Sequence, residues 1–400
     1  MKFSVLIPTH DRLDLLRYAV ESVIRQDYDD WELAISDNDS KEDVAGYIAS
    51  LNDPRIHYSK TDRFIPVTEN WNRCLKMSTG EYVIMLGDDD ALMPSFFTKI
   101  VEVAHQFNKP DVIYIDAYIY AYPEVFENFP AGYLATRCNP FFATTEPCVV
   151  SMESRAQLVG LWMSFKDQAS FNMQFSILRA EFIQSAIRHH RDFFQSLFPD
   201  YYATTICFLT APRVVIYQQP LVIIGINKKS HGFYFLRNQL KVARQVLHAG
   251  TADSELENIK QYLLPGDWLT EGWLSAMVRV QQNCPAELAA YAIRLNMKAY
   301  RQRTIRNLYS RYYRDHLISS VDFKTFTSAL SLSERIWGIW LTLYYSLAGL
   351  LTEQHRKTAF GLFTRVLGKS YQPMMYQPAG KAVNILEVFE QMNRGHVAKE

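Results

Sequence analysis

The chain has 400 residues, in which 42 Lys and Arg residues balance 42 Asp and Glu residues. This neutral balance excludes a global electrostatic attraction to nucleic acid, and the length indicates one large or two modest domains. Hydrophobic residues make up 48% of the sequence, enough for a sizeable core, and the high aromatic content of 14% indicates surfaces for sugars, bases or a membrane interface. The five scattered cysteines lack metal-ligand spacing, which is typical of free thiols in a reducing compartment. Because no signal-like leader precedes the first strand, we expect a cytoplasmic protein.

Strands and helices alternate through the first 115 residues. Short apolar runs bounded by turn residues predict strands at residues 3–8, 31–36, 55–59, 82–86 and 111–115. Apolar residues at helical spacing predict helices at residues 13–26, 42–51, 70–77 and 96–107. This alternation predicts an α/β fold with a parallel sheet, in which ligands bind beyond the carboxyl ends of the strands.

Three polar loops follow predicted strands and therefore meet at that edge of the sheet. They are residues 9–12, residues 37–40 and the consecutive aspartates Asp88, Asp89 and Asp90. Neighbouring carboxylates repel one another, and a divalent cation compensates for this because hard cations bind clustered oxygens. The first strand is followed by neither a glycine-rich dinucleotide fingerprint nor a phosphate-binding loop. The sequence therefore predicts a metal–diphosphate site.

The segments VLIPTHDR, WELAISDNDS and NWNRCLKMSTGEYVIMLGDDDALMP together resemble the N-terminal half of family 2 glycosyltransferases, over roughly residues 3–232. The resemblance implies a GT-A fold, which is a mostly parallel mixed sheet flanked by helices. It also implies transfer of a sugar from a nucleotide-sugar donor, with inversion at the anomeric carbon. A divalent metal, Mn²⁺ or Mg²⁺, is expected on the donor diphosphate.

The resemblance assigns roles to residues of the first two loops. Pro8, Thr9 and Asp11 are expected to surround the nucleotide. Asp37 and Asn38 are expected to read the base, which is usually uracil, although the family commonly has a second aspartate where this chain has Asn38. An asparagine side chain both donates and accepts hydrogen bonds.

The aspartate triplet receives the remaining donor-side roles. Gly87 stands at the first position of the family's Asp-x-Asp motif, which makes Asp89 the expected metal ligand. Asp88 is assigned to the ribose or metal side, and Asp90 to the acceptor or donor-sugar side.

Further candidate contacts lie outside these three loops. Asn72 and Arg73 are on the helix before the triplet, where the family often places nucleotide contacts, and a solvated helix face is the alternative. Lys228, Lys229 and His231 follow a later predicted strand. The two lysines are candidates for diphosphate binding and His231 for metal ligation.

Inversion by direct displacement requires a carboxylate that takes the proton of the attacking hydroxyl. The family usually supplies it from an acidic residue that opens a late helix before a strand. Asp200 is at this position, directly after Pro199 and before an apolar strand at residues 213–225. A helix-capping role is the structural alternative. Asp167 and Asp192 are the next candidates for the base.

Beyond residue 235 the resemblance fades and the pattern predicts helices at residues 235–248, 254–263 and 268–282. Residues 288–314 carry seven basic residues and no acidic one, interleaved with tyrosines. This composition is typical of a membrane-surface or polyanion-binding helix, with a solvated helix face as the alternative. The uncharged residues 336–352 predict a buried helix, an interfacial helix or a short span, and we rank spanning last because it needs ~20 residues.

We therefore expect a catalytic domain at residues 1–235 and a helical region at 236–400. Within the catalytic domain, residues 1–115 form the nucleotide-sugar-binding half and residues 116–235 the acceptor half. The predicted function is hexosyl or N-acetylhexosaminyl transfer from a UDP-sugar to a glycan or lipid-linked acceptor in bacterial surface polysaccharide synthesis. The expected location is the cytoplasm, with peripheral association with the inner face of the cell membrane. A metal-dependent nucleotidyltransferase and a non-catalytic glycan- or lipid-binding protein are the alternatives.

Overall fold

The computed structural model describes residues 1–136, 146–167, 169–230, 233, 259–265, 269–350, 375–378 and 382–397. Its first part contains β1 (Phe3–Thr9), α1 (Leu13–Ile24), β2 (Trp31–Asp37), α2 (Val44–Leu51), β3 (Ile56–Lys60), α3 (Val67–Lys76), β4 (Tyr82–Met85), β5 (Ala91–Leu92), α4 (Phe96–Gln106) and β6 (Val112–Ala121). There follow β7 (Tyr133–Thr136), β8 (Cys148–Val149), α5 (Met152–Trp162), a 3₁₀ turn (Met173–Phe175), β9 (Ser176–Arg179), α6 (Ala180–His190), α7 (Pro199–Thr210) and β10 (Val214–Ile226). The last part contains α11 (Leu269–Asn283), α12 (Pro285–Ala290), α13 (Met297–Tyr313), α14 (Ser320–Ser328), α15 (Leu332–Leu350), β11 (Met375–Pro378) and α17 (Ile385–Val397).

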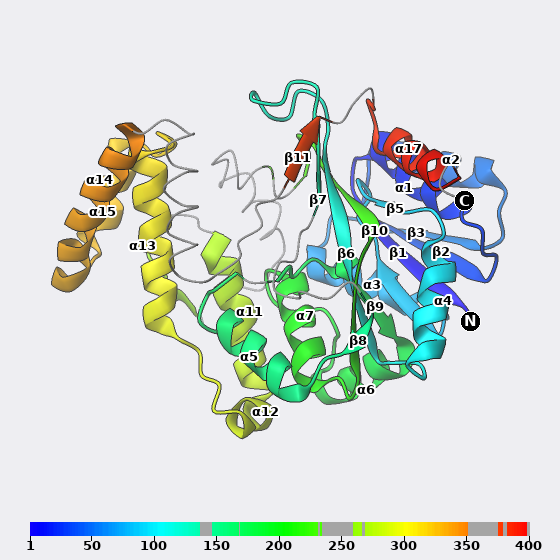
Figure 1. Ribbon diagram of the computed structural model, residues 1–400, viewed down its shortest axis with the longest axis horizontal. Helices are drawn as coiled ribbons and strands as arrows, with labels where there is room; N and C mark the ends of the chain where they lie inside the picture. The colour runs from blue at the N-terminus through cyan, green and yellow to red at the C-terminus, as the bar shows by residue number, and fades with distance from the viewer. Residues whose placement is uncertain are drawn as a thin grey trace.

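One mixed sheet with flanking helices organises the first part of the chain (Figure 1). Its strand order is β11-β7-β6-β9-β4-β1-β2-β3, and β10 pairs with β6 in parallel. Strands β4, β1, β2 and β3 are parallel, whereas β9 is antiparallel to both neighbours. Every residue of β2 is buried, as expected of a parallel strand covered on both faces. The α/β prediction is confirmed, and every element predicted in the first 115 residues is present.

The parallel strands bring their carboxyl ends to one edge of the sheet. β1, β2 and β4 end there. β6 runs in the same direction because β4 and β6 are both antiparallel to β9, so β10, which is parallel to β6, ends there too. Only residues 211–213 connect α7 to β10, so α7 runs back along the strand and begins near the same edge. The fold therefore places the three polar loops and the first turn of α7 on one side of the molecule.

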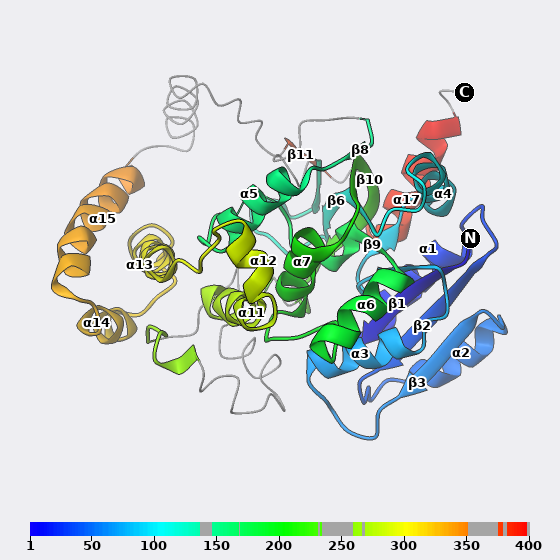
Figure 2. The ribbon, with the colours of Figure 1, turned by 90° about the horizontal axis from the view of Figure 1, so that it is seen from below.

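The C-terminal part is mainly helical, and it returns to the sheet at its end. α11 packs against α7, and α13 packs against α15. β11 pairs with β7, and α17 lies against α1 and β5, so this part of the chain joins the sheet unit beyond the boundary expected at residue 235 (Figure 2). The Arg25 guanidinium binds the Glu390 carboxylate across the contact between α1 and α17 at 2.8 Å.

The predicted C-terminal elements have different outcomes. The helix predicted at residues 268–282 is α11, and residues 336–350 belong to α15. The region predicted as one basic helix is divided between α12 and α13. The helix predicted at 235–248 lies outside the described residues, as does most of that predicted at 254–263. Within the described ranges, no helix has the length and apolar character needed to cross a membrane.

The cysteines in the described ranges are free thiols, as predicted. Cys74, Cys207 and Cys284 are buried, whereas Cys148 is exposed. Cys138 lies outside the described residues.

The carboxylate of Glu32, on β2, is buried inside the sheet unit. Its oxygens accept hydrogen bonds from Ser4 Oγ at 2.6 Å and Thr79 Oγ1 at 2.7 Å, and Lys2 Nζ lies 2.6 Å away. Burial alone would raise the pKa of Glu32, but these contacts outweigh it and lower the pKa to about 2. The contacts therefore stabilise the ionised form of Glu32.

We expect Glu32→Gln to lower the free energy of unfolding at pH 7 by roughly 2–3 kcal/mol, because a charged, hydrogen-bonded partner is lost. Since the folded-state pKa lies below the ordinary value of 4.5, the stabilisation is complete above pH 4.5 and disappears as the pH falls towards about 2. Urea unfolding at pH 7 and pH 3 measures this, and the loss should be smaller at pH 3. Glu21→Gln, at a surface pair with Arg25, is the control and should change stability by less than about 0.5 kcal/mol. An equal loss at both pH values in Glu32→Gln would contradict the assignment.

Candidate active site

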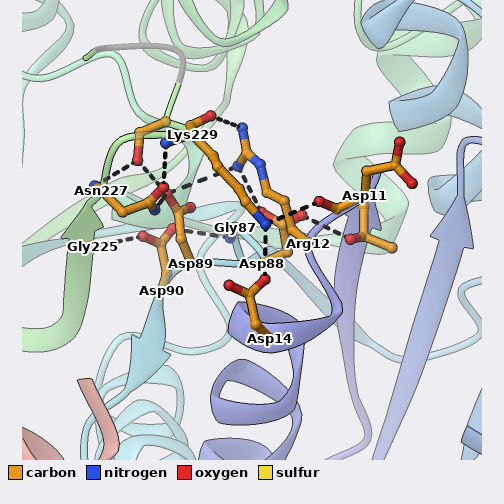
Figure 3. Close-up of polar contacts among 12 residues, drawn as sticks. Asp11, Arg12, Asp14, Gly87, Asp88, Asp89, Asp90, Gly225, Asn227 and Lys229 are labelled. Atoms are coloured by element: carbon orange, nitrogen blue, oxygen red, sulfur yellow. Dashed lines mark hydrogen bonds and ion pairs between the residues drawn. The ribbon is translucent and has the colours of Figure 1, made fainter. Parts of the chain in front are cut away.

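The loops after β1, β4 and β10 meet at the edge of the sheet (Figure 3). Asp88, in the loop after β4, accepts hydrogen bonds from Thr9 Oγ1 at 2.7 Å and from Arg12 Nη1 at 2.9 Å. Burial raises the pKa of the Asp88 carboxyl, and the positive charge of Arg12 offsets part of this effect. Through Asp88, the aspartate triplet is therefore connected to the end of β1 and to the loop that follows it.

Asp89 is held from the opposite side, by the loop after β10. Its Oδ2 accepts hydrogen bonds from Asn227 Nδ2 at 2.7 Å and Ser230 Oγ at 2.6 Å. The Arg12 guanidinium lies 3.9 Å from the same oxygen. In the described part of the chain no hydrogen bond reaches the other oxygen, Oδ1. The carboxylate is thus fixed through one oxygen, and the other is available to a ligand.

Asp90 is enclosed in the structure instead of lying at the rim. Its carboxyl accepts hydrogen bonds from Gln174 Nε2 at 2.7 Å and from the main-chain amides of Gly225 at 2.9 Å and Gly87 at 3.0 Å. Burial and the neighbouring Asp89 raise the pKa of Asp90 to about 8. These contacts fasten the loop to β10, and the assignment of Asp90 to the sugar side stays a prediction.

Gly225 shows how closely β10 approaches this loop. A Cβ atom at this position would overlap the main-chain oxygen of Asp89. A larger residue would therefore push Asp89 away from its partners on the loop after β10.

Two cationic side chains lie at the rim of Asp88 and Asp89. Arg12 also donates to the main-chain oxygen of Lys229, and Lys229 Nζ lies 3.2 Å from Asp14 Oδ1. Lys229 was a sequence candidate, whereas Arg12 was not singled out, although it ends the motif VLIPTHDR. The signal for Arg12 was its place in the loop after the first strand.

The other residues of the first loop connect it to the loop after β2. Asp11 has a left-handed backbone with a φ of 49°. Its amide donates to Ser40 Oγ at 2.9 Å, and its Oδ1 accepts from the amide of Lys41 at 2.6 Å. Pro8 lies in β1 opposite Ser36 of β2. The structure therefore brings Pro8, Thr9 and Asp11 together beside the triplet.

Asp37 and Asn38 are buried, and their side chains are engaged within the protein. Asp37 accepts hydrogen bonds from the Tyr58 hydroxyl at 2.7 Å and the Ser40 amide at 2.9 Å. The Asn38 amide pairs with both the main-chain oxygen and the main-chain amide of Ile65, each at 2.8 Å. These contacts position the loops after β2 and β3, and base reading stays a prediction for both residues.

The two candidates on α3 make structural contacts as well. Asn72 donates to the main-chain oxygen of Phe194 at 2.7 Å and accepts from the Phe194 amide at 3.1 Å. Arg73 donates to Ser59 Oγ and to the main-chain oxygen of Lys60. A nucleotide contact stays a prediction for both side chains.

Asp200 is in the first turn of α7 and partly exposed. The nearby amides of Asp200 and Tyr201 favour its ionised form, but burial dominates and raises the pKa of Asp200 to about 7. No charged side chain in the described ranges forms an ion pair with this carboxyl. Asp167 and Asp192, the other candidates, are both exposed.

One segment connects the first turns of α7 to the aspartate triplet. The ring of Phe171 stacks on Tyr201 with centroids 4.0 Å apart, and its main-chain oxygen accepts from Thr204 Oγ1 at 2.8 Å. Three residues further along, Gln174 donates to Asp90. Asp200 therefore belongs to the same connected part of the structure as the triplet.

The residues present fit a divalent cation that is shared with a substrate. No group of three His, Cys, Asp or Glu side chains in the described ranges is arranged to hold a metal, and His231 lies outside those ranges. Mg²⁺ in phosphate-transfer sites is typically held by one or two carboxylates together with substrate phosphates and water. The open oxygen of Asp89 matches this kind of incomplete protein site.

Comparisons with known proteins show similarity to glycosyltransferases. A family model described as glycosyl transferase family 2 matches residues 4–147. WcaA of Escherichia coli (strain K12), named as a colanic acid biosynthesis glycosyl transferase, is 32% identical over 118 residues, which are 29% of this chain and 42% of that protein. The GalNAc(5)-diNAcBac-PP-undecaprenol beta-1,3-glucosyltransferase of Campylobacter jejuni is 32% identical over 108 residues, 26% of this chain and 35% of that protein. The matches thus span less than half the length of these relatives. TarS 1–349 of S. aureus, solved with UDP-GlcNAc, has a TM-score of 0.46 at 14% identity, over 95% of this chain and 97% of that one.

Proposed function

We propose that this chain transfers a sugar from a UDP-sugar to a glycan or lipid-linked acceptor, with inversion, because residues 4–147 match the model of glycosyl transferase family 2. The observation that carries the proposal is that the loops after β1 and β10 hold Asp88 and Asp89 side by side, and Asp200 in the first turn of α7 supports it as a candidate base. The first two suit a nucleotide diphosphate, and the third suits a proton acceptor.

The donor side uses carboxylates and cations for different tasks. Asp89 would hold the divalent cation, which when bound neutralises charge on the departing diphosphate. Arg12 and Lys229 extend from two loops at the rim, where their positive charges attract phosphate oxygens. Asp88 keeps Arg12 in place beside Asp89.

The acceptor side uses Asp200. A general base is most effective when its pKa lies near the working pH, and burial brings the pKa of Asp200 to about 7. Asp200 takes the proton from the acceptor hydroxyl while the oxygen attacks the anomeric carbon and the diphosphate leaves. The carboxyl is partly exposed and has no paired cation in the described ranges that would suppress its basicity.

The acceptor class is proposed from the names of the relatives. The Campylobacter jejuni relative is named as a glucosyltransferase for an undecaprenol-diphosphate glycan, and the Escherichia coli relative for colanic acid synthesis. We assign this chain to bacterial surface polysaccharide synthesis, with a peripheral position at the inner face of the cell membrane. A nucleotidyltransferase is less well supported because the loop after β1 holds a carboxylate-bound Arg12 and no glycine.

Nucleotide binding and turnover test the proposal together. Calorimetry should show UDP binding that Mn²⁺ tightens about tenfold or more, because a cation shared with the diphosphate adds charge-assisted contacts. A screen of UDP- and GDP-sugars should release UDP. Release of pyrophosphate from nucleoside triphosphates would instead identify a nucleotidyltransferase, and absence of nucleotide binding would identify a non-catalytic binding protein.

A further inference from the structure

One face of α15 carries large apolar side chains in contact with solvent. This face, which we call the α15 stripe, consists of side chains that are between 51% and 76% exposed: Leu332, Ile336, Ile339, Trp340, Leu343 and Tyr344. Their spacing of three and four residues aligns them along one side of the helix. From Ile336 to Ser346 the helix carries no charged residue. Isolated exposed apolar residues are ordinary, but a continuous row of this kind usually marks an interaction surface.

The opposite side of α15 fixes the orientation of the stripe. Leu341 and Tyr345 are buried in a cluster with residues of α13 and α14. Gly338 lets α13 approach closely, since a Cβ atom there would overlap the hydroxyl of Tyr309. The Arg301 guanidinium also binds Glu334 at 2.6 Å and pins the start of α15 to α13. The stripe therefore faces outward, because the other face of α15 already packs against α13 and α14.

The stripe lies at an end of the molecule. Figures 1 and 2 both show α14 and α15 at the end opposite α17. In this position a flat partner can reach the stripe without contacting the sheet.

The surroundings of the stripe are cationic. Residues 297–346 contain eight Lys and Arg residues but only three Asp and Glu residues. Arg306 and Arg314 are exposed and lie near Tyr345 of α15, and Lys324 is exposed on α14. Two of the three acids are already paired, Glu334 with Arg301 and Asp315 with Arg314. An anionic surface therefore complements this end of the molecule.

We propose that the α15 stripe is the surface by which the protein docks on a bilayer containing anionic lipids. Ile and Leu side chains enter the acyl boundary, Trp340 and Tyr344 lie at the headgroup level, and Arg306 and Lys324 bind lipid phosphates. The helix lies in the interface and does not span the membrane. The inference rests on the proposed function only for its purpose, which is to bring the enzyme to a lipid-linked acceptor.

Vesicle flotation with the full chain tests the proposal. Wild-type protein should bind phosphatidylcholine vesicles that contain phosphatidylglycerol more tightly than vesicles of phosphatidylcholine alone. The double substitution Trp340→Ser/Leu343→Ser should weaken binding to the mixed vesicles by about tenfold or more, since two apolar side chains that contact the bilayer are lost. Arg306→Gln/Lys324→Gln should weaken binding to the mixed vesicles by about fivefold or more and leave binding to the neutral vesicles unchanged.

The matched control is Val149→Ser/Val383→Ser, which removes two apolar side chains that are 52% and 62% exposed at other sites. It should leave vesicle binding unchanged. UDP binding, measured on every variant, shows that the fold is intact and separates failure of this inference from failure of the proposed function. Equal vesicle binding by wild type and Trp340→Ser/Leu343→Ser would overturn the proposal. A second result would also overturn it: light scattering shows that the wild type is a dimer and the Trp340→Ser/Leu343→Ser variant a monomer, and neither protein binds vesicles. A second copy of the chain would then cover the stripe.

Discussion

Asp200→Asn is expected to lower kcat by about 10²–10⁴-fold, the usual contribution of a general base. Asparagine keeps the size and the helix-capping ability of aspartate but cannot accept a proton at neutral pH. The affinity for UDP should stay within about twofold of the wild type, because Asp200 is assigned to the acceptor side and not to the nucleotide. Steady-state release of UDP and calorimetry with UDP measure the two effects.

The pH profile gives an independent check on Asp200. A base works in its deprotonated form, so wild-type kcat should rise with pH until it levels off above the pKa of about 7. The residual activity of Asp200→Asn should lack this step. Asp192→Asn is the control, since Asp192 is exposed eight residues earlier, and it should retain wild-type turnover. Full turnover by Asp200→Asn together with loss of activity in Asp167→Asn would transfer the role to Asp167.

The elements of the first 115 residues were predictable because the local sequence of each one indicates its type. β1 and β2 are mostly apolar, since helices cover both faces of a parallel sheet. Each run ends in residues that favour turns, such as Asp37 and Asn38. Local composition was therefore sufficient to locate both the strands and the loops at their carboxyl ends.

The acceptor half was harder because its elements depend on distant partners. β9 has only four residues and lies antiparallel between β4 and β6, so neither its length nor its direction follows the alternating pattern. α17 fills a place on α1 that is created only when residues more than 350 positions apart meet. Such pairings follow from the assembled sheet and leave little local signal.

The same difference applies to the site. The sequence located the aspartate triplet, but it could not assign the three carboxyl groups to separate environments. Asp90 is enclosed because Gln174 and Gly225, from two distant segments, donate to it. Asp89 is oriented by Asn227 and Ser230, which are far along the chain. These contacts decide which aspartate keeps an oxygen open, and they exist only after β10 has paired with β6.

Asp89→Asn is expected to lower kcat/KM by about 10³-fold, because a cation at the diphosphate contributes several kcal/mol of charge stabilisation in the transition state. The neutral amide can still accept hydrogen bonds from Asn227 and Ser230, so the fold and its melting temperature should change little. The sharper expectation concerns Mn²⁺. The tightening of UDP binding by Mn²⁺ in the wild type should disappear in the variant, while the affinity for UDP in the absence of metal should be nearly unchanged. Calorimetry with and without Mn²⁺ separates these effects.

Asp14→Asn supplies the matched control, because Asp14 is a carboxylate at the same rim that contacts Lys229 and not Asp89. Its neutralisation removes one negative charge near the site, but it should leave the effect of Mn²⁺ intact. If both variants lost the metal effect equally, the net charge of the rim would control cation binding and Asp89 would have no special part in it. If Asp89→Asn retained full transfer with the donor and Mn²⁺, the metal assignment would be wrong. Loss in Asp89→Asn alone would assign the cation to the one carboxylate of the aspartate triplet whose second oxygen accepts no hydrogen bond in the described part of the chain.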